Sequence, residues 1–447
     1  MLSLGSSQSR TCGGVSRRAA LQVGGLSLLG LSLPRVLQAE AAQPSATRKP
    51  LNVILLWMGG GPSNIDTFDM KPNAPVEIRG DFSPIESNVA GTPVCEHLPL
   101  MARQMDKVCL LKSVTHSESG DHVAAVHYML TGYPQRPDPS GQPPGALIYP
   151  AYGSVVSREQ GWQNSLPPYM IISGKAAPYT GAGYMGSAYS PLTIKGDPND
   201  PKFSVLDVTI PDAVGADRTA RRRNMLAALD RWQKQQDKTV AAIGERNQFY
   251  NQAYDLITSP SAKRAFKLDE EDEATRDRYG RTRNGQAALL ARRLIEAGTR
   301  FVSVETHWWD THQDNFKTLK TSRLPDLDQW WSALLEDLQQ RGLFENTLVA
   351  WLGEFGRTPR VNGQAGRDHW GYANAICLSG AGIKMGTTFG ETDRNCERPV
   401  GTSHTTHDFA ATIYKLLGID CTKEYLTPDG RPVLINYHGT PISQVLV

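Results

Sequence analysis

The sequence predicts an α/β protein built on a doubly wound, mostly parallel sheet. Short apolar runs at residues 51–58 and 347–354 suit strands that are buried on both faces. Helical and strand patterns alternate between residues 285 and 354, which is typical of right-handed parallel crossovers. Charged, histidine-rich stretches follow several predicted strands, where the carboxyl ends of parallel strands form a ligand-binding crevice. With 40% hydrophobic and 21% charged residues, the composition argues against a disordered or fibrous chain.

The first half of the chain contains two predicted strands. LNVILLWM (51–58) is a continuous apolar run that breaks into a glycine turn at residues 59–72. Residues 146–157 predict a helix and residues 166–173 a strand after it. The segment 175–200, rich in glycine, proline, tyrosine and serine, predicts a long surface loop.

The second half is predicted to alternate between helices and strands. Residues 212–280 form a charged helical insertion, in which acidic residues alternate with a basic cluster, so a solvated hairpin fits better than a nucleic-acid patch. A helix over 285–299 leads into a strand at 301–306. A further helix over 325–343 leads into the strand at 347–354.

Residues 1–41 predict a twin-arginine export signal. Arg17 and Arg18 stand before a short apolar stretch, which ends in a small-x-small cleavage pattern. An ordinary Sec signal or an uncleaved anchor is the alternative. Residues 42–50 then form a polar leader, and 51–447 a single domain. We therefore expect a periplasmic or secreted protein.

The expected mature chain has properties that exclude some partners. Loss of residues 1–41 removes four arginines and one glutamate, so the net charge of +2 becomes −1, and nucleic-acid binding loses its electrostatic support. No later segment is long and apolar enough to cross a bilayer. Five cysteines remain, none in CxxC spacing, which permits one or two disulfides with at least one free thiol.

Carboxylates and imidazoles gather in short stretches at predicted strand ends. Such residues, brought together from several strands, are what a two-metal hydrolytic site needs to hold zinc, manganese or calcium ions. The stretches lie in the glycine turn and in THWWDTHQDNF, GEFGRTP, GRDHWG and SHTTHDF. Their candidate residues are Asp66, Asp69, His307, Asp310, His312, Asp314, Glu354, Asp368, His369, His404, His407 and Asp408.

Plain structural explanations also exist for these residues. His407 and Asp408 fit the capped start of a helix, and Asp69 fits the closing of the glycine turn. Arg357 and Arg367, beside the cluster, favour an oxyanion such as phosphate, sulfate or carboxylate. Each arginine could instead pair with a neighbouring acid.

Five motifs in order resemble one family of secreted bacterial proteins. They are GGPSNIDTFDMKP, THWWDTHQDNF, GEFGRTP, GRDHW and DFAATIYKLLGID, which together span about residues 50–435. This set resembles the family known as domain of unknown function 1501, often labelled sulfatase-like. The run LLEDLQQRGLFENTLVAWLGEFGRTP is also similar to a segment of the sulfatase and alkaline phosphatase superfamily. The resemblance implies an α/β fold of alkaline phosphatase/sulfatase type with its site at the carboxyl edge of the sheet.

The chain departs from the superfamily pattern at metal positions. Gly59 and Gly60 stand where an acid pair usually follows the first strand, with Asp66 as the nearest substitute. Phe355 stands at the histidine of the usual Asp-His-Gly motif. The usual Asp-x-x-x-His stretch reads as residues 310–314, with its histidine in the middle.

The position of the nucleophile differs as well. SVTHSESGDHVAAVHYMLTGYPQ resembles the sulfatase segment from Cys-x-Pro-Ser-Arg to Leu-Thr-Gly, and counting back places His122 at the formylglycine position. A formylglycine mechanism is therefore not supported, and His122 is a candidate metal ligand, general base or phosphoryl acceptor. It could also line a helix surface with His116 and His127. Nearby alternative nucleophiles are Thr115, Ser117 and Ser119.

The expected function is an exported, metal-dependent hydrolase of phosphate or sulfate esters, whose substrate is a small molecule or a polysaccharide. His122, Arg357 and Arg367 are the expected catalytic residues. A catalytically silent sulfatase-like binding protein is the alternative, and the oligomeric state is left open. The expected metal ligands are a subset of Asp66, Asp310, His312, Asp314, Glu354, Asp368 and His369.

Overall fold

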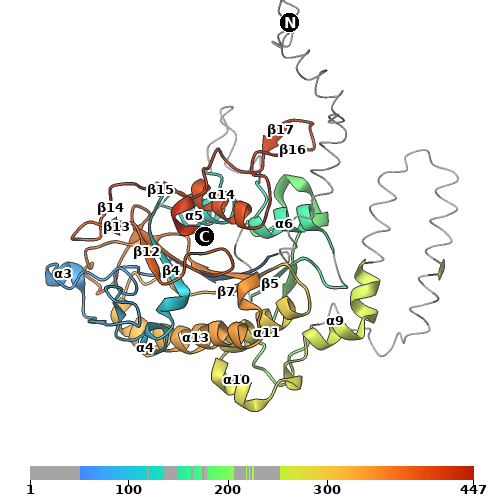
Figure 1. Ribbon diagram of the computed structural model, residues 1–447, viewed down its shortest axis with the longest axis horizontal. Helices are drawn as coiled ribbons and strands as arrows, with labels where there is room; N and C mark the ends of the chain where they lie inside the picture. The colour runs from blue at the N-terminus through green and yellow to red at the C-terminus, as the bar shows by residue number, and fades with distance from the viewer. Residues whose placement is uncertain are drawn as a thin grey trace, which may run out of the picture. The chain divides into compact units, whose positions relative to one another are not determined.

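A nine-stranded sheet lies at the centre of the part of the chain that the computed structural model describes (Figure 1). That part comprises residues 51–118, 120–134, 148–162, 165–173, 177, 179–205 and 252–447, with the single positions 218, 221, 224 and 225. The predicted signal, the leader and most of the predicted insertion lie outside it. The sheet contains β1 (Asn52–Met58), β4 (Val108–Thr115), β5 (Tyr169–Ile172), β6 (Leu192–Ile194), β7 (Phe301–Thr306), β8 (Thr347–Leu352), β11 (Asn374–Gly380), β12 (Thr387–Phe389) and β15 (His404–Thr405).

The strand order is β12-β4-β11-β8-β1-β7-β5-β6, with β15 also paired to β4. Every pairing is parallel except the two made by β11, which runs antiparallel to β4 and to β8. Val53 of β1 faces Phe301 of β7 on one side and Leu348 of β8 on the other. The predicted mostly parallel α/β sheet is confirmed.

Helices cover both faces of the sheet, because its strands are apolar on both faces. Alternate residues of β1 enter two separate cores: Ile54 and Leu56 one core, and Val53 and Leu55 the other. The first core includes residues of α4, α11 and α13, and the second includes residues of α5, α6 and α14 (Figure 1). The helices are α3 (Val76–Arg79), α4 (Pro99–Ala102), α5 (His122–Thr131), α6 (Tyr152–Gln160), α9 (Pro260–Ala265), α10 (Glu273–Tyr279), α11 (Arg283–Glu296), α12 (Asn315–Thr318), α13 (Leu324–Gln340) and α14 (Thr406–Leu416).

Short elements complete the described chain. The π-helical turn η6 (Leu319–Arg323) joins α12 to α13. The 3-10 turns are η1 (Met105–Lys107), η2 (Gly183–Met185), η3 (Ser187–Tyr189), η5 (Leu268–Glu270), η7 (Phe344–Asn346) and η8 (Ser443–Val445). Two-stranded ribbons are formed by β2 (Pro84–Ile85) with β3 (Val94–Cys95), β9 (Gly356–Arg357) with β10 (His369–Trp370), β13 (Glu391–Thr392) with β14 (Pro399–Val400), and β16 (Glu424–Leu426) with β17 (Pro432–Leu434).

Most strands and helices predicted in the described chain are found close to their expected bounds, although the helix expected at 146–157 is found as α6 at Tyr152–Gln160. Strands β4, β11, β12 and β15 of the sheet have no counterpart in the sequence prediction. The predicted loop at 175–200 contains the edge strand β6, and Tyr184 and Met185 within it are buried. All five cysteines in the described residues are free thiols, so the disulfides that the count permits are not formed there. Within the described residues, no helix combines the length and apolarity that a membrane crossing requires.

A buried arginine on α11 links the end of the predicted insertion to α13. The side chain of Arg292, on α11, is fully buried. It forms ion pairs with Glu271 at 2.8 Å, Glu296 at 2.7 Å and Asp337 of α13 at 2.8 Å. One guanidinium therefore joins three segments of the chain.

Replacing Arg292 by Met should lower the free energy of unfolding by about 3–5 kcal/mol, because the buried carboxylates lose their central cation. Urea denaturation of the purified protein measures this. Arg281→Met is the matched control, since Arg281 pairs with Glu273 and Asp277 at the surface and its loss should cost less than about 1 kcal/mol. Equal losses in the two variants would contradict the assignment.

A second buried charge lies within β7. Glu305 is only 3% exposed, and its Oε2 accepts a hydrogen bond from the Ala177 backbone N–H at 2.7 Å. Burial raises the pKa of this carboxyl to about 7, from an ordinary value of 4.5. The folded protein therefore binds this proton more tightly than the unfolded chain does.

Between about pH 4.5 and pH 7 this carboxyl should lower the free energy of unfolding as the pH rises, because the unfolded chain releases the proton first. At about 1.4 kcal/mol per pKa unit, the loss is roughly 3 kcal/mol and is complete above pH 7. Glu305→Gln removes the titration, so its stability relative to the wild type should increase by that amount across the same range. Exposed Glu345→Gln is the control, and a flat difference for Glu305→Gln would refute the prediction.

Candidate metal centre

The ends of three neighbouring parallel strands bring the predicted site segments together. After β1 the chain turns through three glycines, after β7 it passes through residues 307–314, and after β8 it reaches Glu354. The glycines allow a very close approach. A Cβ on Gly60, whose φ is 112°, would lie 2.4 Å from the Asp310 backbone N, and one on Gly61, whose φ is 78°, would lie 2.6 Å from the Phe355 ring. The glycine backbone thus leaves room for Asp310 and Phe355 to pack directly against this turn.

Four side chains converge at this edge and form the candidate metal centre: His122, Asp310, His312 and His369. One ligand atom from each lies within 4.8 Å of all the others. The Nε2 atoms of His312 and His369 are 2.9 Å apart. The Asp310 carboxylate lies 3.1 Å from Nε2 of His312, 3.3 Å from that of His122 and 3.4 Å from that of His369.

Each of the three imidazoles comes from a different structural element. His122 is the first residue of α5, whose N-cap Asp121 accepts a hydrogen bond from Val123 N–H at 3.0 Å. His312 lies in the loop between β7 and α12. His369 belongs to β10 and is paired with Arg357 of β9.

Two further carboxylates lie behind the imidazoles. Glu354 is 2% exposed, and its Oε1 lies 2.8 Å from both His122 Nδ1 and the Gly60 N–H. Asp368 Oδ1 lies 2.6 Å from His312 Nδ1. An ionised carboxylate only accepts, so in the neutral form of each imidazole the Nδ1 carries the proton and the Nε2 lone pair is left for the centre. Both acids were predicted as direct ligands; the structure places one oxygen of each against a histidine Nδ1, outside the group of four converging ligand atoms.

The charges in the centre are strongly coupled. The hydrogen bond that His122 donates to the Glu354 carboxylate raises the pKa of His122 and outweighs its burial. Burial, followed by the neighbouring His122, lowers the pKa of His369. Burial acts to raise the pKa of Asp310, but the Arg357 guanidinium and the nearby histidines hold that pKa below its ordinary value.

Arg357 is a positioning residue in this arrangement. Its side chain is fully buried, and its NH2 donates to Asp310 at 2.5 Å. The other guanidinium donors go to backbone carbonyls, including Gly61 O at 2.9 Å and Arg367 O at 3.1 Å, and a further one reaches Gly60 O. These contacts fix the Asp310 carboxylate and disfavour the predicted oxyanion contact.

The structure pairs Asp66 with Arg367, away from the four converging side chains. Both side chains are fully buried, and the guanidinium makes a bidentate contact with the carboxylate at 2.7 and 2.8 Å. Asp66 also accepts from Ser63 at 2.6 Å and from Asn315 at 2.8 Å. Of the two interpretations given for Arg367, oxyanion binding or pairing with a neighbouring acid, the structure agrees with the second.

The remaining candidates lie outside the candidate metal centre. Asp314 is exposed at the start of α12, and Asp69 pairs with Lys71 and Lys112 at 3.1 and 3.0 Å. Asp408 completes a capping box at the start of α14, as its helix-start pattern predicts. Hydrogen-bond partners elsewhere hold the other histidines: His116, His127, His307, His404 and His407.

Phe355 forms the floor of the candidate metal centre. It is fully buried, and its ring centroid lies 4.4 Å from that of His369 and 5.1 Å from that of His122. An apolar ring thus packs against two imidazoles directly after Glu354. His122, which comes from the other end of the sequence, completes the set.

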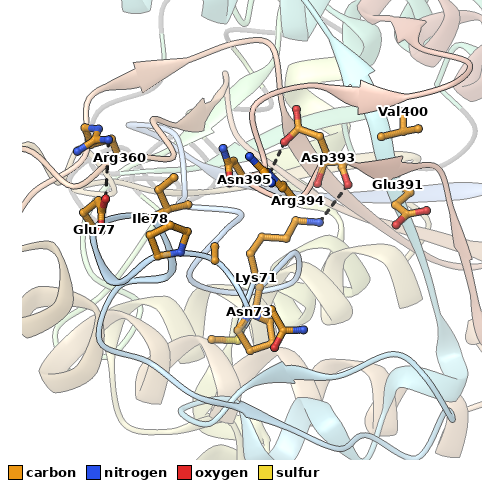
Figure 2. A pocket seen from close by; sticks show the side chains of 15 residues that line it. Lys71, Asn73, Glu77, Ile78, Arg360, Glu391, Asp393, Arg394, Asn395 and Val400 are labelled. Atoms are coloured by element: carbon orange, nitrogen blue, oxygen red, sulfur yellow. Dashed lines mark hydrogen bonds and ion pairs between the residues drawn. The ribbon is translucent and has the colours of Figure 1, made fainter.

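A separate pocket of about 780 Å³ lies beside the ribbon β13–β14 (Figure 2). Its lining includes Lys71, whose Nζ donates to Thr392 O at 3.3 Å, and Arg360, which lies 3.9 Å from Glu77. Three basic and three acidic side chains line it, so their formal charges cancel and give no preference for an ionic ligand. None of the four residues of the candidate metal centre lines this pocket.

Solved structures with a similar fold share little sequence with this chain. The PsFucS1 sulfatase from Pseudoalteromonas sp. is 11% identical, with 86% of this chain and 71% of that one covered and a TM-score of 0.38. The alkaline phosphatase from the Antarctic bacterium TAB5 is 14% identical, with 83% and 99% covered and a TM-score of 0.37. At these TM-scores the likeness carries no information about activity.

Sequence comparison places the chain more firmly. No curated protein matches it. The model of one family, described as a protein of unknown function (DUF1501), matches residues 51–446, which is nearly all of the chain after the predicted leader. The chain therefore belongs to the DUF1501 family.

Proposed function

We propose that the protein is an exported, metal-dependent hydrolase of phosphate or sulfate esters. The convergence of three imidazole Nε2 atoms on the Asp310 carboxylate carries this proposal. Export is supported by the paired arginines, Arg17 and Arg18, before the apolar stretch, which lies outside the described residues.

The donor set fits a transition metal. Zinc bonds of about 2.0–2.2 Å at tetrahedral angles separate ligand atoms by roughly 3.3–3.6 Å, close to the contacts made by Asp310. Glu354 supports a cation as well, because its buried Oε2 has no hydrogen-bond partner among the described residues. Three imidazoles suit zinc or manganese better than calcium, which prefers six to eight oxygen ligands.

The chain's own residues would divide the work. A bound cation would supply Lewis acidity for the ester and lower the pKa of a bound water. Arg357 would hold Asp310, while Glu354 and Asp368 would hold the imidazoles of His122 and His312 by their Nδ1–H groups. His122, whose side chain is 34% exposed, keeps its alternatives of ligand, general base and phosphoryl acceptor.

A catalytically silent binding protein is the second candidate, and the two arginines favour it. Arg357 and Arg367 are both fully buried and bonded to carboxylates and carbonyls, so neither presents an uncommitted donor surface to an oxyanion. Turnover separates this candidate from the hydrolase, whereas metal binding is expected of both.

Mass spectrometry of the purified protein after reconstitution should find about one equivalent of zinc or manganese. His312→Ala and His369→Ala should lose it, because each removes an Nε2 donor. Asp368→Asn should weaken binding by about 10- to 100-fold, since it leaves the His312 ring unoriented. Asp314→Ala is the control and should keep the metal. A wild type that stays metal-free would end both the metal site and the hydrolase proposal.

The metal-loaded wild type should hydrolyse 4-nitrophenyl phosphate or 4-nitrophenyl sulfate, and a chelator should abolish this. His122→Ala should lower kcat by at least about 100-fold if the imidazole serves as base or nucleophile. His407→Ala is the matched control, because His407 contacts Tyr128 and lies outside the candidate metal centre. Full metal loading without turnover of any ester would select the binding protein.

A further inference from the structure

One tryptophan at the rim of the candidate metal centre stands apart from the fold. Trp308 is 76% exposed, whereas its neighbour Trp309 is 3% exposed and belongs to the core. The backbone of Trp308 is left-handed, with φ of 75°. A bulky residue in that conformation is strained, and such strain persists only where the surroundings impose it.

The surroundings here fix both sides of Trp308. Trp309 donates its backbone N–H to Gly59 O at 3.1 Å and its indole N–H to Thr306 Oγ1 at 2.9 Å. Its carbonyl accepts from Arg357 at 3.3 Å, and the same guanidinium holds Asp310. With the following residues held in this way, the chain turns at Trp308 and leaves its indole in solvent.

The Trp308 indole has no ring or hydrogen-bond partner among the described residues. A glycine would tolerate the backbone conformation better and would expose no apolar surface. A strained, exposed indole within two residues of a candidate ligand therefore has its explanation outside the folded chain.

We propose that Trp308 is the stacking platform for a pyranose ring that carries the reacting ester, an inference that rests on the proposed function. Trp308 and Asp310 are two residues apart, so their Cα atoms are separated by at most about 7 Å, which is within the span of a hexose and its ester group. Val123, 40% exposed, directly follows His122 and is a further exposed apolar side chain next to a candidate ligand.

A sugar ring fits this surface better than a flexible alkyl chain does. An indole is rigid and amphipathic, so it offers a large contact area at little entropic cost. A pyranose has an apolar face of C–H groups for the indole, and its hydroxyl groups can stay hydrated at this open rim. A ring-free ester would reach the centre without using Trp308, so Trp308 would act on specificity.

The test compares esters with and without a ring by calorimetric titration of the metal-loaded protein. The ring probes are glucose 6-phosphate and glucose 6-sulfate, and the ring-free probes are glycerol 3-phosphate and propyl sulfate. Trp308→Gly should weaken binding of the ring probes at least tenfold and change the ring-free probes less than twofold. Its melting temperature should not fall. Trp308→Phe should recover part of the loss, and Leu426→Ala, at another exposed apolar side chain, should change nothing.

Other results would overturn the platform. The first is that the wild type binds neither ring probe. The second is that the wild type and Trp308→Gly bind the ring probes equally. The third is that the Trp308→Gly change affects only 4-nitrophenyl esters. Turnover measured in parallel keeps the two proposals apart. Trp308-dependent ring binding without hydrolysis of any probe retains the platform and rejects the hydrolase. Hydrolysis of the ring probes by Trp308→Gly with an unchanged KM retains the hydrolase and rejects the platform.

Discussion

The buried guanidinium of Arg357 is the interaction on which the candidate metal centre depends. It joins the glycine turn after β1 to the loop after β7, and it fixes the carboxylate of Asp310. Three imidazoles converge on that carboxylate. Its position is therefore fixed by Arg357, which follows β8, rather than by the histidines themselves. A buried charge without its partner is costly, so the fully buried arginine requires the carboxylate of Asp310.

The sequence carries most of the fold because its strands are short and almost purely apolar. The runs that became β1, β7 and β8 could be read directly, since a strand buried on both faces leaves no polar alternation to obscure it. Strand β11 could not be placed, because its direction depends on pairing with both β8 and β4, and β4 lies far away in sequence. No local pattern encodes that reversal.

The sequence indicated which residues lie in the candidate site better than it indicated what each of them does there. Strand ends identified Asp310, His312 and His369, because parallel strands meet at one edge. Whether a carboxylate contacts the Nε2 or the Nδ1 of a histidine depends on the three-dimensional positions of the side chains. The motifs GEFGRTP and GRDHW therefore do not show that Glu354 and Asp310 lie on different sides of the imidazoles. His122 and Glu354 lie 232 residues apart, so their hydrogen bond has no sequence signal.

The central position of β1 bears on how the chain is made. This strand is the first described element to be synthesised, yet both of its neighbours, β7 and β8, begin only at Phe301 and Thr347. At a synthesis rate of about 5–20 residues per second, this strand, whose residues after Asn52 are all apolar, has no neighbouring strand to pair with for tens of seconds. The strand can therefore pair only after most of the chain has been made, and until then it is an exposed apolar segment of the kind that chaperones bind.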